Sequence, residues 1–215
     1  MIGLNTVKLR GIYGDDETIA CSAWVIMPDE LTPERRSRIP RFLKDTLVGL
    51  SDPAHGPPHT SPFEKGIIHF LVTTDIATHI HILKHRIGVS TNAESARYKE
   101  LREDRAYVPV DWPFPLQSRL VDDIDLAQKK YHEYIEELVA SGFSRQRAKE
   151  SARYILPYAT QISADIVFHF NTFMHFQTLR NDTHAQLEVR EIAKEMLEIV
   201  RDTGKFPASL AAYGY

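Results

Sequence analysis

The chain has a single cysteine and no long apolar run among its 215 residues. One thiol, that of Cys21, excludes an intramolecular disulfide and a zinc site built from cysteines. No stretch approaches the ~20 apolar residues that a membrane-spanning helix needs. Residues 1–16 also lack the basic start and the apolar centre of a secretory signal peptide. We therefore expect a cytoplasmic protein that does not bind a membrane.

An excess of charge of either sign is also missing, because the formal net charge is only -3. A chain with this balance is not expected to bind a nucleic acid polymer. Any site for a phosphate group must come from local clusters of lysine and arginine. The length fits one domain, residues 1–215.

Turn residues and apolar spacing divide the chain into strands and helices. Alternating apolar residues predict strands at 6–14 and 65–74, with Ile68, Phe70 and Val72 on one face of the second. Caps and helical spacing predict helices at 17–27, 32–50, 76–86, 116–142, 144–155, 171–182 and 184–204. Residues 161–170 fit a strand or a helix. The pattern predicts an α+β domain that is richer in helix than in strand.

Residues 84–98, KHRIGVSTNAESARY, hold two cationic clusters joined by small polar residues. Lys84 and Arg86 fall at the end of a predicted helix, where the helix dipole favours cations without any ligand. Ser95 and Arg97 add a hydroxyl and a guanidinium, which together suit a phosphate group. The stretch is too polar for a core strand. On its own it fits either a charged helix end or a site for an anionic ligand.

Histidines in the same region raise the question of a metal. His81 and His85 stand four residues apart, which on a helix is a spacing of metal ligands. No third ligand is evident, and the HExxH pattern is absent. We therefore predict no metal site and expect these imidazoles to pack or to form hydrogen bonds.

Three further stretches each allow a structural or a functional explanation. HTSPFE (59–64) is stiffened by proline and suits either a ligand-contacting loop or the entry to a strand. SARYILP (151–157) places Arg153 near a helix end, as a surface residue or a ligand contact. TLRNDTHAQLE (178–188) places Arg180 and a histidine at a break between helices, which is either a capped corner or a cleft.

Taken in order, these stretches resemble the flavin-dependent thymidylate synthases. The family signature has Arg-His-Arg, two residues, Ser-x-Asn, two residues and Ser-x-Arg. This chain has Lys84-His85-Arg86, three residues, Ser90-Thr91-Asn92, two residues and Ser95-Ala96-Arg97. HTSPFE, ARYILP and LRNDTHAQ resemble the other motifs of the family.

The resemblance implies an α+β fold with a small, mostly antiparallel sheet packed by several helices. It implies reductive methylation of dUMP to dTMP, with FAD as cofactor and with NADPH and methylenetetrahydrofolate, a folate, as co-substrates. It also implies a homotetramer with active sites at the subunit interfaces. Because Cys21 lies outside every motif, a mechanism that begins with a thiolate is not expected.

The resemblance also implies roles for individual residues. Arg180 would be catalytic, as a fixed cation at the uracil edge that stabilises negative charge while C5 becomes nucleophilic. The nucleotide dUMP would contact Lys84, Ser95, Arg97, Arg153 and Arg180. FAD would contact His59, Ser61, Lys84, His85, Arg86, Asn92, His169 and His184.

Departures from the family pattern leave two alternatives open. Lysine replaces arginine at position 84, one residue is inserted before Ser90, histidine replaces glutamine at 81, and His169 and Asn171 replace asparagine and arginine. Lysine keeps the charge but loses the bidentate geometry of arginine. The chain could instead hydroxymethylate a pyrimidine nucleotide at C5, or bind nucleotide and flavin without turnover.

Overall fold

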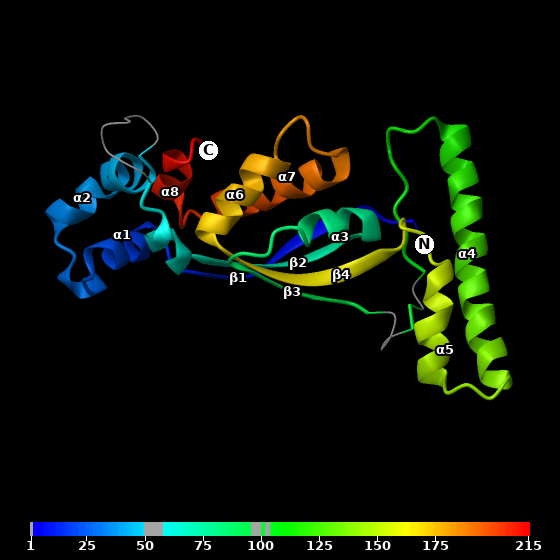
Figure 1. Ribbon diagram of the computed structural model, residues 1–215. Coiled ribbons are helices and arrows are strands. Elements are labelled where there is room, and N and C mark those ends of the chain that lie inside the picture. Colours follow the sequence, from blue (N-terminus) through cyan, green and yellow to red (C-terminus); the bar gives the residue numbers. More distant parts are fainter. Residues whose placement is uncertain (1, 50–57, 96–99, 102–103) are drawn as a thin grey trace. The chain divides into compact units, whose positions relative to one another are not determined.

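The fold contains a four-stranded antiparallel sheet, in a computed structural model that describes residues 2–49, 58–95, 100–101 and 104–215 (Figure 1). The strand order is β1-β2-β4-β3. The strands are β1 (Thr6–Tyr13), β2 (Ile67–Asp75), β3 (Val89–Ala93) and β4 (Gln161–His169). The predicted α+β class is confirmed. The ambiguous stretch 161–170 is a strand, with Ala164, Ile166 and Phe168 buried in alternation.

Contacts within the chain divide it into two compact units. Unit 1 consists of residues 1–6, 72–84 and 92–165, and unit 2 consists of residues 7–71, 85–91 and 166–215. The assignment of residues 1–215 to one domain stays a prediction.

Unit 2 is built around fully buried phenylalanines from several elements. Its helical elements are α1 (Asp16–Trp24), the 3-10 turn η1 (Pro28–Glu30), α2 (Pro33–Arg41), the π-helical η2 (Phe42–Val48), the 3-10 helix η4 (Ser61–Lys65), α6 (Phe170–Arg180), α7 (Leu187–Asp202) and α8 (Pro207–Ala212). The buried rings are Phe63, Phe70, Phe168, Phe170, Phe173, Phe176 and Phe206. Each buried side chain of this size stabilises a fold by about 1.5–3 kcal/mol. Gln177 ties α6 to α7 by donating to the Ala193 carbonyl at 2.9 Å.

Helix α8 is joined to α1 by one carboxylate. Asp16 accepts hydrogen bonds from the backbone N–H groups of Ala208 and Ser209 at 2.7 and 2.8 Å, and from the Ser209 hydroxyl. These are the free donors at the start of α8, so a residue distant in sequence serves as the cap of this helix. Burial raises the pKa of Asp16.

Unit 1 contains the longest helix, α4 (Phe114–Ala140), which packs against α5 (Arg145–Ala152) (Figure 1). Tyr131 and Ile135 of α4 are buried against Ala148 and Ala152 of α5. The unit also holds α3 (Ile76–Ile82) and the 3-10 turn η5 (Arg153–Ile155). The predicted cap of α3 is confirmed, since Asp75 accepts from the Thr78 N–H at 2.8 Å.

Several predicted boundaries were wrong. Helix α3 ends at Ile82, so Lys84 and Arg86 lie beyond its end and not in its last turn. No strand was predicted at residues 89–93, which form β3 at the edge of the sheet, where polar side chains are tolerated. The helix predicted at 32–50 changes to π-helical geometry at Phe42, after Pro40 has removed one backbone donor. Helix α8 was not predicted.

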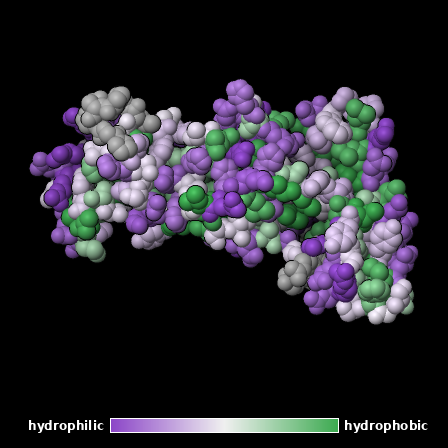
Figure 2. All heavy atoms as spheres, viewed as in Figure 1, coloured by the Kyte–Doolittle hydropathy of each residue, from purple (hydrophilic) through white to green (hydrophobic). Residues whose placement is uncertain are grey.

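The surface of α2 is hydrophilic (Figure 2). Its one buried side chain is Ile39, and its four arginines are exposed. This is the pattern of a helix with a narrow apolar stripe. In the part of the chain that the structure describes, no helix combines the length and the apolar character needed to span a bilayer.

The turn between Arg86 and β3 depends on Gly88. Its φ of +65° lies in the left-handed region, and an added Cβ would collide with the Thr172 hydroxyl and approach His169 Nδ1 to 3.1 Å. The turn is held to the start of α6, because the Thr172 hydroxyl donates to the Ile87 carbonyl at 2.9 Å and the His169 N–H donates to the Gly88 carbonyl at 2.9 Å. The residue inserted into the family signature therefore falls in a turn that glycine makes possible.

Gly88→Ala is expected to destabilise the protein more than Gly204→Ala. Both glycines have left-handed φ angles, +65° and +63°, but no atom lies within 4 Å of a Cβ on Gly204. The left-handed backbone alone costs roughly 1–2 kcal/mol. At position 88 the methyl group also displaces the Thr172 hydroxyl and breaks its hydrogen bond. Urea unfolding of both variants measures the difference. Equal losses in the free energy of unfolding would show that the Thr172 side chain moves aside without destabilising the protein.

Candidate functional site

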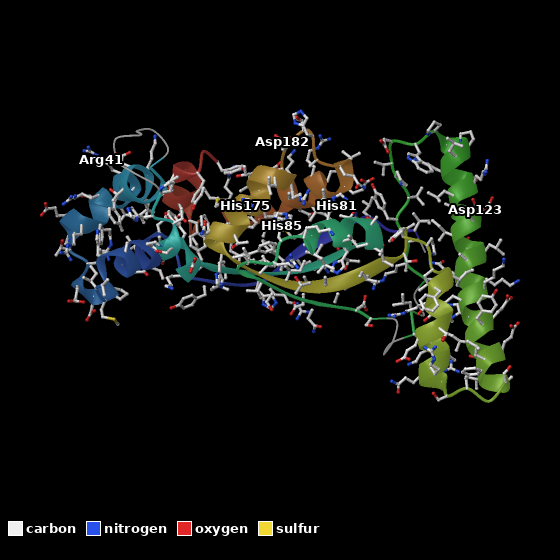
Figure 3. The ribbon with its side chains drawn as sticks, in the orientation of Figure 1. Arg41, His81, His85, Asp123, His175 and Asp182 are labelled. Atoms are coloured by element: carbon white, nitrogen blue, oxygen red, sulfur yellow. The ribbon has the colours of Figure 1, made fainter. Side chains whose placement is uncertain are left out.

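Arg180 and His85 contact each other in unit 2, although they are far apart in sequence. Arg180 is the last residue of α6, and its Nε–H donates to Nε2 of His85 at 3.1 Å. The His85 ring is buried and lies edge-on to Phe176, with the ring centroids 5.0 Å apart. His175 of α6 lies beside it, with centroids 5.9 Å apart (Figure 3). The predicted catalytic arginine is therefore held by a histidine that we had assigned to the flavin.

The His85 imidazole is neutral in this environment. Burial, the Arg180 guanidinium and His175 together lower the pKa of His85 from 6.5 to about 4. A neutral ring that accepts at Nε2 carries its proton on Nδ1. His85 can therefore hold the arginine by a hydrogen bond while leaving the positive charge of the guanidinium uncompensated.

The terminal nitrogens of Arg180 remain available to a ligand. A guanidinium has five N–H donors, and the contact with His85 uses only the one on Nε. Among the residues that the structure describes, none accepts a hydrogen bond from the other four. The side chain is half-buried. A half-buried cation with its remaining donors free suits a carbonyl or anionic ligand.

The HTSPFE stretch forms η4, which is anchored by its phenylalanine. Phe63 is fully buried and stacks on Phe170, with the centroids 5.9 Å apart. Before the helix, the Thr60 hydroxyl accepts from the Asn171 amide at 3.3 Å, and the Tyr213 hydroxyl donates to the Asn171 carbonyl oxygen at 3.4 Å. His59 and Ser61, two residues predicted to bind FAD, are exposed at the start of this anchored turn.

Asn171 has a structural partner on each side of its amide. We had counted it among the departures from the family pattern, which has arginine at this position. Its contacts with Thr60 and Tyr213 instead tie the η4 turn to α6 and to the C-terminal residues. The exchange of arginine for asparagine thus has a packing explanation.

His184 lies in the loop between α6 and α7 and is 94% exposed. Its ring Nδ1 lies 2.7 Å from the Asp182 carboxylate, which also accepts from the His184 backbone N–H at 2.8 Å. That backbone hydrogen bond is the main cause of the lowered pKa of Asp182. Figure 3 shows Asp182 in this loop and His85 under α6. The loop therefore offers His184 to solvent rather than to the Arg180 pair.

The remaining predicted residues of unit 2 are Arg86 and His169. Arg86 is exposed just before the Gly88 turn, and His169 is half-buried at the end of β4. Together with His59, Ser61 and His184 they form a set of hydrogen-bond donors at or near the surface of unit 2. Neutral and cationic donors of this kind fit the phosphates and ring edges of a dinucleotide such as FAD.

Unit 1 holds the other part of the predicted set. Lys84 and Asn92 are exposed, Ser95 follows the end of β3, and Arg153 begins η5. The Arg153 guanidinium is half-buried, and no described residue accepts a hydrogen bond from it. Arg97 lies outside the described residues.

Metal ligands do not gather at any point among the described residues. The helical spacing of His81 and His85 is not realised, because α3 ends at Ile82. His81 belongs to unit 1 and His85 to unit 2.

The sequence analysis missed one contact and one pair of residues. It named His85 and Arg180 separately, but nothing in local spacing indicated that they touch. It did not name Glu94 and Arg105, which contact each other at 2.8 Å in the unit that holds Ser95. A glutamate directly before Ser95 was the available signal for that pair.

A family model and individual known proteins relate this chain to the same family. A family model described as thymidylate synthase complementing protein matches residues 12–207. The flavin-dependent thymidylate synthase of Kosmotoga olearia is 29% identical over 220 residues, covering 96% of this chain and 89% of that protein. The enzyme of the same name from Thermotoga neapolitana is 30% identical over 202 residues, covering 91% and 85%.

Two solved structures share the fold. Both are of the UMP/dUMP methylase PolB from Streptomyces cacaoi. The structure bound with 5-Br UMP has a TM-score of 0.72 and 25% identity, covering 99% of this chain and 95% of that one. The structure bound with 5-Br dUMP has a TM-score of 0.74 and 23% identity, covering 99% and 96%.

The neutral state of His85 predicts a dependence of stability on pH. The folded state binds this proton only below about pH 4, whereas the unfolded chain binds it below about 6.5. Between these pH values the unfolded state carries one more proton than the folded state. The free energy of unfolding therefore falls as the pH falls, by up to about 1.4 kcal/mol per pH unit. His85→Gln keeps an acceptor and does not titrate, so it should remove this part of the slope. Urea midpoints measured from pH 7 to 4 test this, and parallel curves for the two proteins would show that His85 is not the titrating group.

Proposed function

This chain belongs to the thymidylate synthase complementing protein family, the family of the flavin-dependent thymidylate synthases, and we propose that it methylates dUMP at C5 to give dTMP. Methylenetetrahydrofolate would supply the carbon and NADPH the reducing equivalents, with FAD as cofactor. The observation that carries the proposal is the guanidinium of Arg180, held by neutral His85 with its terminal donors free of described protein acceptors.

Arg180 would act on the uracil ring. Negative charge develops on the ring oxygens as C5 becomes nucleophilic, and a cation fixed beside them stabilises that charge. The hydrogen bond to His85 fixes the guanidinium before the substrate arrives, so less reorganisation is needed in the transition state. Because His85 is uncharged, it does not neutralise the arginine.

The flavin would be held by unit 2. When bound, FAD supplies the redox and one-carbon chemistry, and the protein supplies binding and orientation. Arg86 would bind a phosphate, and His59, Ser61, His169 and His184 would donate to the ring system or the pyrophosphate. Asn171 would act indirectly, by holding the turn that carries His59 and Ser61.

The nucleotide would be held by unit 1. Ser95 and Arg153, with Lys84 and Arg97 from the same motifs, would bind the phosphate of dUMP, and Asn92 would contact FAD. The family resemblance supports a homotetramer with active sites at subunit interfaces. In such an assembly one subunit can supply the phosphate site while another supplies Arg180.

A second substrate is favoured by the structural comparison. The solved structures of the same fold are named as UMP/dUMP methylase, and one of them holds 5-Br UMP. We therefore propose UMP as the alternative substrate. Mass spectrometry of nucleotides after incubation with dUMP or UMP, methylenetetrahydrofolate, FAD and NADPH tests both. Methylated product from dUMP supports the main proposal, a hydroxymethyl product supports the alternative chemistry, and unchanged nucleotides with bound flavin contradict catalysis.

Arg180→Ala is expected to lower kcat by about 100- to 1,000-fold, the usual cost of removing one donor that stabilises developing charge. FAD content should stay close to that of the unmodified protein. Arg201→Ala is the matched control, because Arg201 is an exposed arginine in the last turn of α7. Steady-state kinetics with dUMP measure both variants, and full turnover by Arg180→Ala would refute the proposed role.

A further inference from the structure

The short segment that begins at His85 is attached to α6 at two places. Near the C-terminal end of the helix, Arg180 donates from Nε to His85 Nε2 at 3.1 Å. Near the N-terminal end, the Thr172 hydroxyl donates to the Ile87 carbonyl at 2.9 Å. All four residues belong to unit 2, so one helix holds this segment from both of its ends.

Packing of side chains contributes little to holding the turn at residues 87 and 88. The side chain of Ile87 is 88% exposed. Two hydrogen bonds hold the backbone of the turn instead. His169, the last residue of β4, supplies one from its backbone N–H to the Gly88 carbonyl at 2.9 Å. Thr172 supplies the other from its side chain, so this bond can be removed by a substitution.

The turn and the Thr172 side chain fit each other closely. Gly88 has a φ of +65°, and a Cβ at this position would collide with the Thr172 hydroxyl. The hydroxyl therefore occupies the space that a side chain on residue 88 would need. A side chain of the same shape without the hydroxyl would leave the Ile87 carbonyl to solvent and release the turn from α6.

A change in the turn would move His85, which lies two residues before Ile87. The His85 ring is buried and lies edge-on to Phe176 of α6. In this position it accepts the hydrogen bond that fixes the Arg180 guanidinium. Because a misplacement of ~1 Å can cost about 100-fold in rate, a small shift of the ring would affect the proposed chemistry.

We propose that Thr172 is a positioning residue for Arg180, because its hydroxyl holds the turn that follows His85 against α6. This inference rests on the proposed function, since it takes Arg180 as the residue that stabilises negative charge on the uracil ring. Thr172 acts through the place of the His85 ring and not by contact with the reacting atoms.

Thr172→Val in the full-length flavin-loaded protein tests the proposal, because valine keeps the shape of threonine and lacks the hydroxyl. We expect kcat with dUMP to fall about tenfold, less than the roughly 100-fold that a full 1 Å misplacement can cost. The KM for dUMP should stay within about twofold, because the phosphate contacts proposed in unit 1 are unchanged. Thr172→Ser keeps the hydroxyl and should keep most of the kcat.

The dependence of stability on pH is a second measurement, which needs no turnover. Burial, Arg180 and His175 keep His85 neutral, so the free energy of unfolding falls between pH 6.5 and about 4. If Thr172 holds the His85 ring in this place, Thr172→Val should show a smaller fall over the same range. Loss of a hydrogen bond without movement of the ring would instead lower the stability equally at every pH.

Thr203→Val is the matched control. The Thr203 hydroxyl donates to the Val200 carbonyl at 2.7 Å, directly after α7 and also in unit 2. The substitution thus removes the same kind of hydrogen bond at a position outside the family motifs. It should change neither kcat nor the dependence of stability on pH.

Three results would overturn the proposal. An unchanged pH dependence of stability in Thr172→Val would show that the turn holds His85 without the hydroxyl. A changed pH dependence with full kcat would show that the place of His85 does not govern Arg180. A Thr172→Ser protein as slow as Thr172→Val would show that the hydroxyl is not the group that matters.

Failure of the proposed function gives a different result. The unmodified protein would then not convert dUMP, whereas the pH dependence of stability would still report whether Thr172 holds His85. The two failures are therefore distinguishable.

Discussion

Strand β4 forms hydrogen bonds with residues of both units. Near its start, Gln161 donates to the Arg105 carbonyl, and Ser163 exchanges hydrogen bonds with Glu94. Its last residue, His169, receives the Gly88 turn and begins the chain into α6, which ends at Arg180. The hydrogen bonds of β4 thus hold Glu94 and Arg105 in unit 1, and the Gly88 turn at the start of α6 in unit 2.

Two arginines of the chain have partners of different charge. At Arg180 the partner is a neutral imidazole, so the guanidinium is held in place but keeps its full positive charge for a ligand. At Arg105 the partner is the Glu94 carboxylate, 2.8 Å away, so the charge of the guanidinium is compensated within the protein. The neutral partner of Arg180 leaves it the charge that its proposed catalytic role requires.

Much of the fold could be predicted from the sequence, because its signals are local. The alternation of Ile68, Phe70 and Val72, the Asp75 cap and the Gly142 stop are each set by neighbours in the chain, and each is confirmed. Strand β3 was missed because an edge position removes the need for apolar residues. Helix α8 was missed because its cap, Asp16, comes from the other end of the chain.

The candidate site was predictable in its residues but not in its contacts. The family motifs pointed to Arg180 and His85 separately, and only the fold brings them to 3.1 Å. The hydrogen bonds of Asn171 with Thr60 and Tyr213 were not predicted, because they depend on the packing of three separate segments. Non-local contacts of this kind leave no periodic trace in a single sequence.

The reaction proposed for this chain replaces the hydrogen at C5 of a uridine nucleotide. The most direct test uses dUMP that carries tritium at C5, because any substitution at that carbon must release the label to water. We expect tritium release that requires both methylenetetrahydrofolate and FAD and that is lost in the Arg180→Ala variant. Retention of the label by the flavin-loaded protein with all substrates present would contradict it.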